Sequence, residues 1–248
     1  MHTASPDEGG RDPAVVEFMK AETANALWDA LPAGTRRLYH KTLVDLPAGT
    51  LLVRQGERIT QAFFPTTAVC SIAVELASGD KAETAAVGSD GFIGVPLVLG
   101  MLMSDSSKVV QLPGKGYLIT AKQLLELCKQ HESFRKALFG YSAFRLHLAS
   151  RSVACNAFHS IPERLARWLL FTHDRAGQDE FRLTHEALSA VLAATRPRVS
   201  EAAMKLKATG IIDYRRGVVR ILDRKRLEAL SCECYEETKR SLTSTPGH

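Results

Sequence analysis

The sequence predicts an α+β protein in which a β-rich part, a long helix and a winged helix-turn-helix follow one another. Short β-type runs separated by Gly and Pro turns fill residues 43–120, which is typical of a small barrel or sandwich. Residues 121–158 contain no Pro and a single Gly, as expected for a long helix. Two short helical patterns and a hairpin with a basic tip follow within residues 183–223.

The composition is that of a globular protein with an uneven charge distribution. The 248 residues are 45% hydrophobic and 24% charged, which is ample for a buried core. Residues 1–150 carry 15 basic and 15 acidic residues, whereas residues 151–248 carry 17 and 12. Ten basic and three acidic residues fall within 196–226. This asymmetry favours a neutral sensor joined to a binder of polyanions; a solvated basic face is the alternative.

Several features indicate a cytoplasmic protein with no membrane partner. The longest apolar stretch, residues 92–103, is too short to span a membrane and is interrupted by Gly and Pro. The N-terminal residues are acidic and polar and lack the features of a secretory signal. Five cysteines without a framework spacing fit a reducing compartment.

Five segments are predicted along the chain. They are a partly disordered N-terminal extension (1–24), a β-rich sensor domain (25–122), a long dimerisation helix (123–160), a winged helix-turn-helix domain (161–235) and a C-terminal tail (236–248). The predicted strands are 50–53, 62–64, 69–75, 82–87, 109–112 and 116–119.

A heptad pattern on the long helix predicts a dimer interface. The residues that step by four and three are Ala137, Tyr141, Phe144, Leu148, Arg151, Cys155 and Phe158, which are apolar apart from the arginine. The stretch is much longer than the mean globular helix of about 11–12 residues, so we favour association of two copies. Packing of the helix on its own domain is the alternative.

Residues 183–223 combine the features of a winged helix-turn-helix. Thr184 is expected to cap a short helix, and Thr195 to cap a second helix over 196–209 that ends before Gly210. A hairpin with the tip 215–217 follows. A helix pair alone also occurs in many protein cores. The order of helix pair, caps, glycine, hairpin and basic residues is what indicates DNA binding.

The outward face of the second helix supplies the expected DNA contacts. Arginine can donate two parallel hydrogen bonds to guanine, and lysine can neutralise phosphate. Residues in the first turns of such a helix meet base edges, whereas residues of the hairpin meet phosphates. The predicted DNA-binding residues are Thr184, Thr195, Arg196, Arg198, Ser200, Glu201 and Lys205, with Arg215 and Arg216 on the hairpin.

With these parts in this order, the chain resembles the Crp–Fnr superfamily of bacterial transcription regulators. The resemblance covers residues 25–230 and rests on the string LTHEALSAVLAATRPRVSEAAMKLKATGIIDYRRGVVRILDR, on CNAFHSIPERLARWLL, and on the glycine spacing between residues 49 and 94. It implies a double-stranded, jelly-roll-like β-roll similar to cyclic-nucleotide-binding domains. The resemblance also implies a homodimer that binds a near-palindromic promoter site and RNA polymerase. It implies that the protein is not an enzyme.

The residues that hold cyclic AMP in such regulators are replaced here. A Gly-Glu pair is replaced by Gly94 and Val95, and an Arg-Ser/Thr-Ala triplet by Ser106, Ser107 and Lys108. A cyclic phosphate would therefore lack its bidentate cation, and we expect no tight binding of cyclic AMP. These five residues mark a candidate pocket for an unknown effector.

No cofactor is predicted. Because the first cysteine is Cys70, the sequence argues against an N-terminal iron–sulfur cluster, and a lone His2 gives no support for haem.

The Cys232-Glu233-Cys234 segment has two interpretations. Both thiols could ligate one metal ion, with Cys155, His159 or a dimer mate supplying further ligands, or could act as a redox switch. Zinc sites are usually built from two spaced ligand pairs, so we favour the interpretation that one thiol packs and the other is incidental. No metal site is therefore predicted.

No catalytic motif is present either, and no enzyme is expected. The alternative to a DNA-binding regulator is an effector- or redox-sensing β-roll that acts through protein partners with a non-functional helix-turn-helix.

Overall fold

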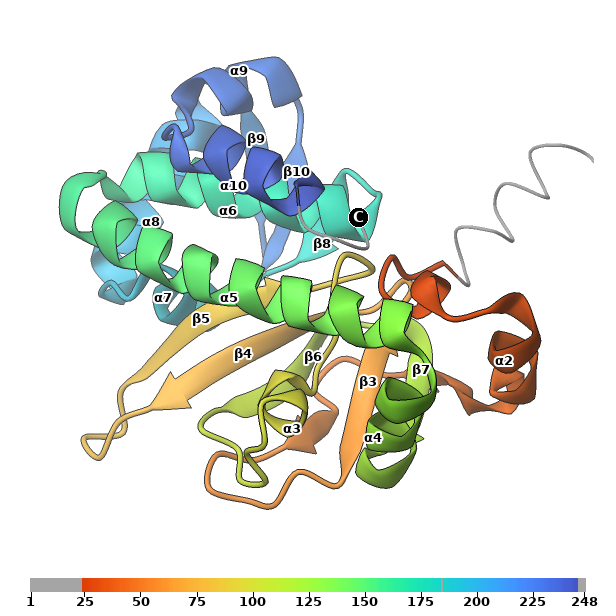
Figure 1. The fold of residues 1–248 in the computed structure, drawn as a ribbon. Helices are drawn as coiled ribbons and strands as arrows, with labels where there is room; N and C mark the ends of the chain where they lie inside the picture. Colours follow the sequence, from red (N-terminus) through yellow and green to blue (C-terminus); the bar gives the residue numbers. More distant parts are fainter. Residues whose placement is uncertain (1–23, 184, 245–248) are drawn as a thin grey trace, which may run out of the picture.

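The computed structural model describes residues 24–183 and 185–244. The predicted N-terminal extension, up to residue 23, and the capping role of Thr184 lie outside the described residues. Within the described part, a β-roll, a long helix and a winged-helix domain follow one another, as predicted. Figure 1 shows the long helix α5 (Glu132–Phe158) between the sheets and the winged-helix domain. No described helix is long and apolar enough to cross a membrane.

Two antiparallel sheets form the β-roll, with strand orders β1-β7-β3 and β2-β6-β4-β5. The strands are β1 (Leu43–Leu46), β2 (Leu51–Val53), β3 (Gln61–Pro65), β4 (Val69–Glu75), β5 (Lys81–Val87), β6 (Ser107–Leu112) and β7 (Gly114–Thr120). Apolar side chains of both sheets, including Phe63, Cys70 and Val110, share one buried cluster. All six predicted strands form, with ends shifted by at most two residues, and β1 is additional.

A short N-terminal segment packs on the β-roll through Trp28. This segment contains η1 (Trp28–Ala30), α2 (Ala33–Leu38) and η2 (His40–Thr42). The Trp28 ring is fully buried and stacks on Tyr117, with the ring centroids 4.7 Å apart. The Asn25 side chain donates hydrogen bonds to the carbonyls of Pro65 and Gly91, so it fixes this segment to the β-roll.

The predicted long helical stretch is two helices. α4 (Ala121–Gln130) begins with a capping box between Thr120 and Gln123 and ends at His131, whose backbone is extended. α5 follows, and the break places apolar residues of both helices in one core cluster with α3 (Val95–Val98). The 27-residue α5 contacts both the β-roll and the C-terminal helix.

The predicted dimer seam of α5 is wrong in its choice of face. Five of its seven residues are buried within the chain's own core: Ala137, Tyr141, Phe144, Leu148 and Cys155. Arg151 forms an ion pair with Glu237 of the same chain, and Phe158 is 85% exposed. The error arises because α5 is apolar on two faces. We call the second face the outer row; its exposed residues are Phe139, Ala143, Leu146, Ser150, Val153 and Ala157.

The winged-helix domain is built around α6. Its elements are α6 (Ile161–Ala176), β8 (Glu180–Arg182), α7 (His185–Leu192), α8 (Arg196–Ala208), β9 (Ile212–Arg215), β10 (Val218–Ile221), α9 (Arg224–Leu230) and α10 (Cys234–Thr243). α6 begins with a capping box between Ser160 and Glu163 and ends at Gly177, whose φ is +62°. The hairpin is joined by β8, which the sequence did not predict, so the sheet order is β8-β10-β9.

The predicted C-terminal tail contains a packed helix. Tyr235 and Thr238 of α10 are buried, and the helix contacts both α5 and α6. Leu242 packs against the core cluster that α5 shares with the β-roll. Spacings of three and four residues put these side chains on one face, so the segment folds as an amphipathic helix instead of a tail.

Two polar side-chain contacts join the winged-helix domain to the β-roll, beside an apolar cluster that Val69 and Leu112 of the β-roll share with α6. Arg175 of α6 donates to both carboxylate oxygens of Asp90, at 2.9–3.1 Å. Trp168 of α6 donates its indole N–H to Glu83 of β5, at 2.9 Å. Burial raises the pKa of the Glu83 carboxyl, against the opposing effect of hydrogen bonds from Ser71 and Trp168. The two domains therefore meet through specific polar contacts.

Candidate nucleic-acid interface

The turn between α7 and α8 has the geometry of a helix-turn-helix. Ala193 takes a left-handed conformation with a φ of +44°, and Thr195 holds the N-cap position of α8. The Thr195 side chain accepts no capping hydrogen bond, in contrast to the prediction. Pro197 at the second helical position has no N–H, which removes one of the two donors that an N-cap side chain can reach.

α8 presents a polar face away from the core of its domain. Val199, Ala202, Ala203 and Leu206 are buried beneath it. The predicted contact residues Arg196, Arg198, Glu201 and Lys205 are exposed, and Ser200 is half-buried. Glu201 and Lys205 form an ion pair of 2.8 Å, and the hydrogen bond from Lys205 lowers the pKa of Glu201.

Met204 also lies on the exposed side of α8, with 57% of its surface accessible. Met204 was not among the predicted DNA-binding residues because a methionine in an amphipathic helix is usually assigned to the core. An exposed apolar side chain among basic ones suits contact with a thymine methyl group.

The hairpin tip carries the two predicted arginines. Arg216 and Gly217 have φ values of +50° and +75°, as a two-residue hairpin turn requires. Arg215 is exposed and pairs with Asp213 at 3.0 Å. Lys207 of α8 also pairs with Asp213, at 3.1 Å. Because Lys207 belongs to α8 and Asp213 to the hairpin, this ion pair links the hairpin to α8.

The net charge of residues 196–226 overstates the charge that DNA would meet. Arg220 pairs with Glu180, and Arg224 pairs with Asp174 and Glu228. These contacts lie within the domain and neutralise two of the ten basic residues. The exposed arginines of α8 and of the hairpin tip remain the main source of positive potential on the predicted DNA-binding face.

The first turn of α8 borders the β-roll. A cleft of about 650 Å³ lies between the β4–β5 turn and the α7–α8 turn. Gly79 and Asp80 line one side of this cleft, and Thr195 and Arg196 line the other. The end of α8 that was predicted to meet base edges is thus next to the β-roll.

The candidate effector pocket is a cavity of about 290 Å³ between the second sheet, α3 and α5. It is lined by four of the five predicted residues, Gly94, Val95, Ser106 and Lys108, and also by Arg145 of α5. Ser107 is not among the lining residues. Its hydroxyl accepts a hydrogen bond from the backbone N–H of Gln55, at 3.0 Å.

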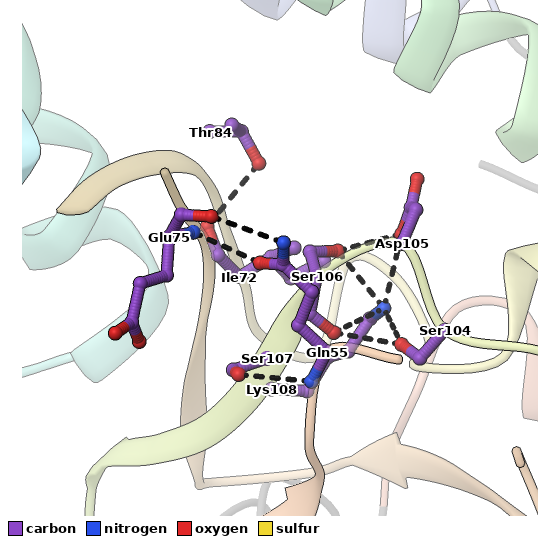
Figure 2. A network of polar contacts seen from close by, with 9 residues as sticks. All are labelled: Gln55, Ile72, Glu75, Thr84, Ser104, Asp105, Ser106, Ser107 and Lys108. Atoms are coloured by element: carbon purple, nitrogen blue, oxygen red, sulfur yellow. Dashed lines mark hydrogen bonds and ion pairs between the residues drawn. The ribbon is translucent and has the colours of Figure 1, made fainter. Parts of the chain in front are cut away.

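Lys108 is engaged by its own chain (Figure 2). Its ammonium group donates to the carbonyl and the hydroxyl of Ser106, each at 2.9 Å, and to Asp105 at 3.3 Å. Ser104 is a further partner. Burial lowers the pKa of Lys108, and the nearby Asp105 opposes that shift. With its donors used in this way, Lys108 is poorly suited to hold a cyclic phosphate.

Four potential metal ligands, which the sequence suggested together only in the interpretation that we did not favour, lie side by side where α5 meets α10. Cys155 and His159 lie at the end of α5. Cys232 precedes α10, and Cys234 is its first residue. Their ligand atoms all lie within 4.8 Å of one another. The hydrogen bond between Cys155 and Cys232 lowers the pKa of Cys155 and raises that of Cys232. The Cys-x-Cys spacing was the only signal in the sequence.

Comparison with known proteins agrees with this architecture. Residues 163–230 match the family model of the Crp-like helix-turn-helix domain. The match covers α6 through α9 and includes the exposed face of α8 and the hairpin. Comparison with curated proteins gives no significant match.

Several solved structures share the fold of this chain over most of its length. FixK2 from Bradyrhizobium japonicum has a TM-score of 0.66 at 17% identity, over 77% of this chain and 97% of FixK2. A putative Crp/FNR-family regulator from Eubacterium rectale has a TM-score of 0.62 at 18% identity, over 82% and 96%. CLP from Xanthomonas campestris has a TM-score of 0.60 at 18% identity, over 77% and 99%. The chain thus shares its fold with these structures, and its residues 163–230 match the Crp-like helix-turn-helix model.

Proposed function

We propose that the protein is a transcription regulator that binds a specific sequence in double-stranded promoter DNA. The observation that carries this proposal is the exposed row of Arg196, Arg198 and Lys205 on α8, next to the basic hairpin tip, in a Crp-like helix-turn-helix domain. In such a domain the second helix enters the major groove and the hairpin meets the backbone. As a bacterial-type DNA-binding regulator, the protein would act in the cytoplasm and, by family resemblance, with RNA polymerase.

The regulator acts as a homodimer in this proposal. The outer row of α5 leaves Phe139, Leu146 and Val153 exposed at intervals of seven residues, which is the spacing of a two-stranded coiled coil. Two parallel copies of α5 would relate two copies of α8 by a two-fold axis. Their recognition helices would then enter successive major grooves about 34 Å apart on a near-palindromic site.

The β-roll is proposed to control the orientation of the DNA-binding domain. Its cavity is large enough for a small effector. Because the ammonium group of Lys108 is already bonded within the chain, we propose that this effector is not cyclic AMP. An effector that binds one orientation better than another shifts the population toward it. The contacts of Arg175 with Asp90 and of Trp168 with Glu83 are the links that such a shift would change.

The first test is selection of bound sequences from random duplex DNA by the full chain without added ligand. We expect a two-fold symmetric motif. Failure to enrich any sequence, together with no salt-sensitive DNA binding, would favour the alternative of a sensor that acts through protein partners. Weak, salt-sensitive binding to all DNA would instead place the DNA-competent state under effector control.

Two variants separate base contact from phosphate contact. Arg198→Ala is expected to cost about 1–3 kcal/mol on the selected site and to relax sequence preference. Arg216→Ala is expected to weaken specific and random DNA alike and to lower the salt dependence by roughly one phosphate contact. Arg240→Ala, an exposed arginine on α10, is the control and should leave both affinities unchanged. If Arg198→Ala lowers the affinity for specific and random DNA equally, Arg198 does not contact a base.

A further inference from the structure

The side chains of Cys155, His159, Cys232 and Cys234 form a compact cluster at the junction of the long helix and the winged-helix domain. Cys155 and His159 are four residues apart, so they project from the same side of the last turn of α5. Cys232 lies between α9 and α10, and Cys234 is the first residue of α10. The three cysteines are almost fully buried, and 17% of the His159 side chain is exposed.

The distances match a single tetrahedral metal ion. Cys155 Sγ lies 3.6 Å from Cys232 Sγ, and Cys234 Sγ lies 3.7 Å from His159 Nδ1. With Zn–S bonds of about 2.3 Å and Zn–N bonds of about 2.0–2.1 Å, neighbouring ligand atoms of a tetrahedral site lie roughly 3.5–3.8 Å apart. All four ligand atoms fall within 4.8 Å of one another. They are too close together to be divided between the two irons of a two-iron iron–sulfur cluster.

The groups around the cluster complete the chemistry of such a site. His159 turns Nδ1 toward Cys234, and its Nε2 lies 3.1 Å from the carboxylate of Glu233. Metal-binding histidines commonly donate their second ring N–H to a carboxylate, which fixes the tautomer and orientation of the ring.

The charge balance also fits. Three thiolates and a divalent ion carry one net negative charge, and the positive charge of Arg167 acts on all three sulfurs. The Arg167 Nε is itself buried without a hydrogen-bond partner among the described residues.

We propose that Cys155, His159, Cys232 and Cys234 bind one zinc-type divalent ion and thereby fasten the end of α5 to the start of α10. Four protein ligands close the tetrahedron and leave no position for substrate, so the site is structural. Coordination releases the thiol protons to solvent and involves no oxidation. This proposal does not depend on DNA binding.

The test is the metal content of the full chain purified under reducing conditions, measured by mass spectrometry of the elements. We expect about one zinc per chain. Replacement with Co²⁺ should give the intense visible absorption of a tetrahedral cobalt–thiolate site. Cys232→Ser and His159→Gln should lose the bound metal, whereas Cys128→Ser, a buried cysteine of α4, should retain it.

A measurement on the unaltered protein guards against variants that fail to fold. A strong chelator should lower Tm, and addition of Zn²⁺ should restore it. Absence of metal with no effect of Zn²⁺ on Tm would overturn the proposal. A Cys155–Cys232 disulfide in metal-free protein, or iron with acid-labile sulfide, would also overturn it in favour of redox chemistry.

Discussion

Ala193 holds the helix-turn-helix turn in a backbone conformation that residues with a Cβ rarely adopt. Its φ of +44° lies in the left-handed region, which costs such residues about 1–2 kcal/mol. Glycine avoids this cost but loses more entropy on folding, by roughly 0.5–1 kcal/mol. The turn therefore stores a small amount of strain beside the recognition helix.

Replacement of Ala193 with glycine is expected to stabilise the winged-helix domain by about 0.5–1 kcal/mol, the difference between these two effects. The measurement is the free energy of unfolding in urea. Ala194→Gly is the matched control, because Ala194 is not in the left-handed region, and should destabilise instead. Destabilisation by both variants would show that the Ala193 conformation carries no appreciable strain.

Glu83 makes the stability of the domain contact depend on pH. Burial raises the pKa of this carboxyl above its ordinary value of 4.5, so the folded state favours the neutral form. The contribution of the Glu83 carboxyl to the free energy of unfolding is therefore fully present below about pH 4.5. It is lost as the pH rises through the raised pKa of Glu83.

We expect the free energy of unfolding of the natural protein, relative to Glu83→Gln, to fall as the pH rises from about 4.5 toward neutrality. Glutamine has a similar shape and does not titrate, so the difference isolates residue 83. A difference that stays constant or grows over this pH range would contradict the role of burial.

At the scale of elements, local patterns predicted most strands and the helix-turn-helix. β4 was predicted with its observed bounds, and α8 differs by one residue at its end. These elements are marked by alternation, capping residues and glycine turns, which act over a few residues. β8 was missed because its three residues become a strand only through pairing with β10.

The face of α5 could not be predicted from the sequence, and the cysteine cluster could be offered only as an alternative, for a different reason. α5 has two heptad rows of apolar residues, and only the position of the β-roll decides that the row with Tyr141 and Phe144 is internal. Cys155 and Cys232 are 77 residues apart and meet through tertiary packing. By contrast, the exposed face of α8 follows from its own periodicity, so most of its exposed residues could be predicted.

At the scale of the whole molecule, the outer row of α5 predicts which substitution would break the proposed dimer. Leu146 is 71% exposed at the middle of this row. Burial of a leucine contributes about 1.5–3 kcal/mol, so Leu146→Asp should raise the dimer Kd at least about tenfold. Sedimentation equilibrium measures this change.

Leu38→Asp provides the control for the dimer experiment. Leu38 is 81% exposed on α2 and lies outside the outer row, so its replacement should leave the dimer intact. If Leu146→Asp and Leu38→Asp have the same Kd as the natural protein, the copies associate through another surface.

The position of α10 sets an order of assembly during synthesis. Ribosomes make the β-roll and α5 before α10, and domains generally fold as units while the chain emerges. Until α10 arrives, Cys155 and Arg151 at the end of α5 lack Cys232 and Glu237, which contact them in the finished fold. The outer row is complete by then, so in the proposed dimer two nascent chains on neighbouring ribosomes would be able to pair through α5 before α10 is in place.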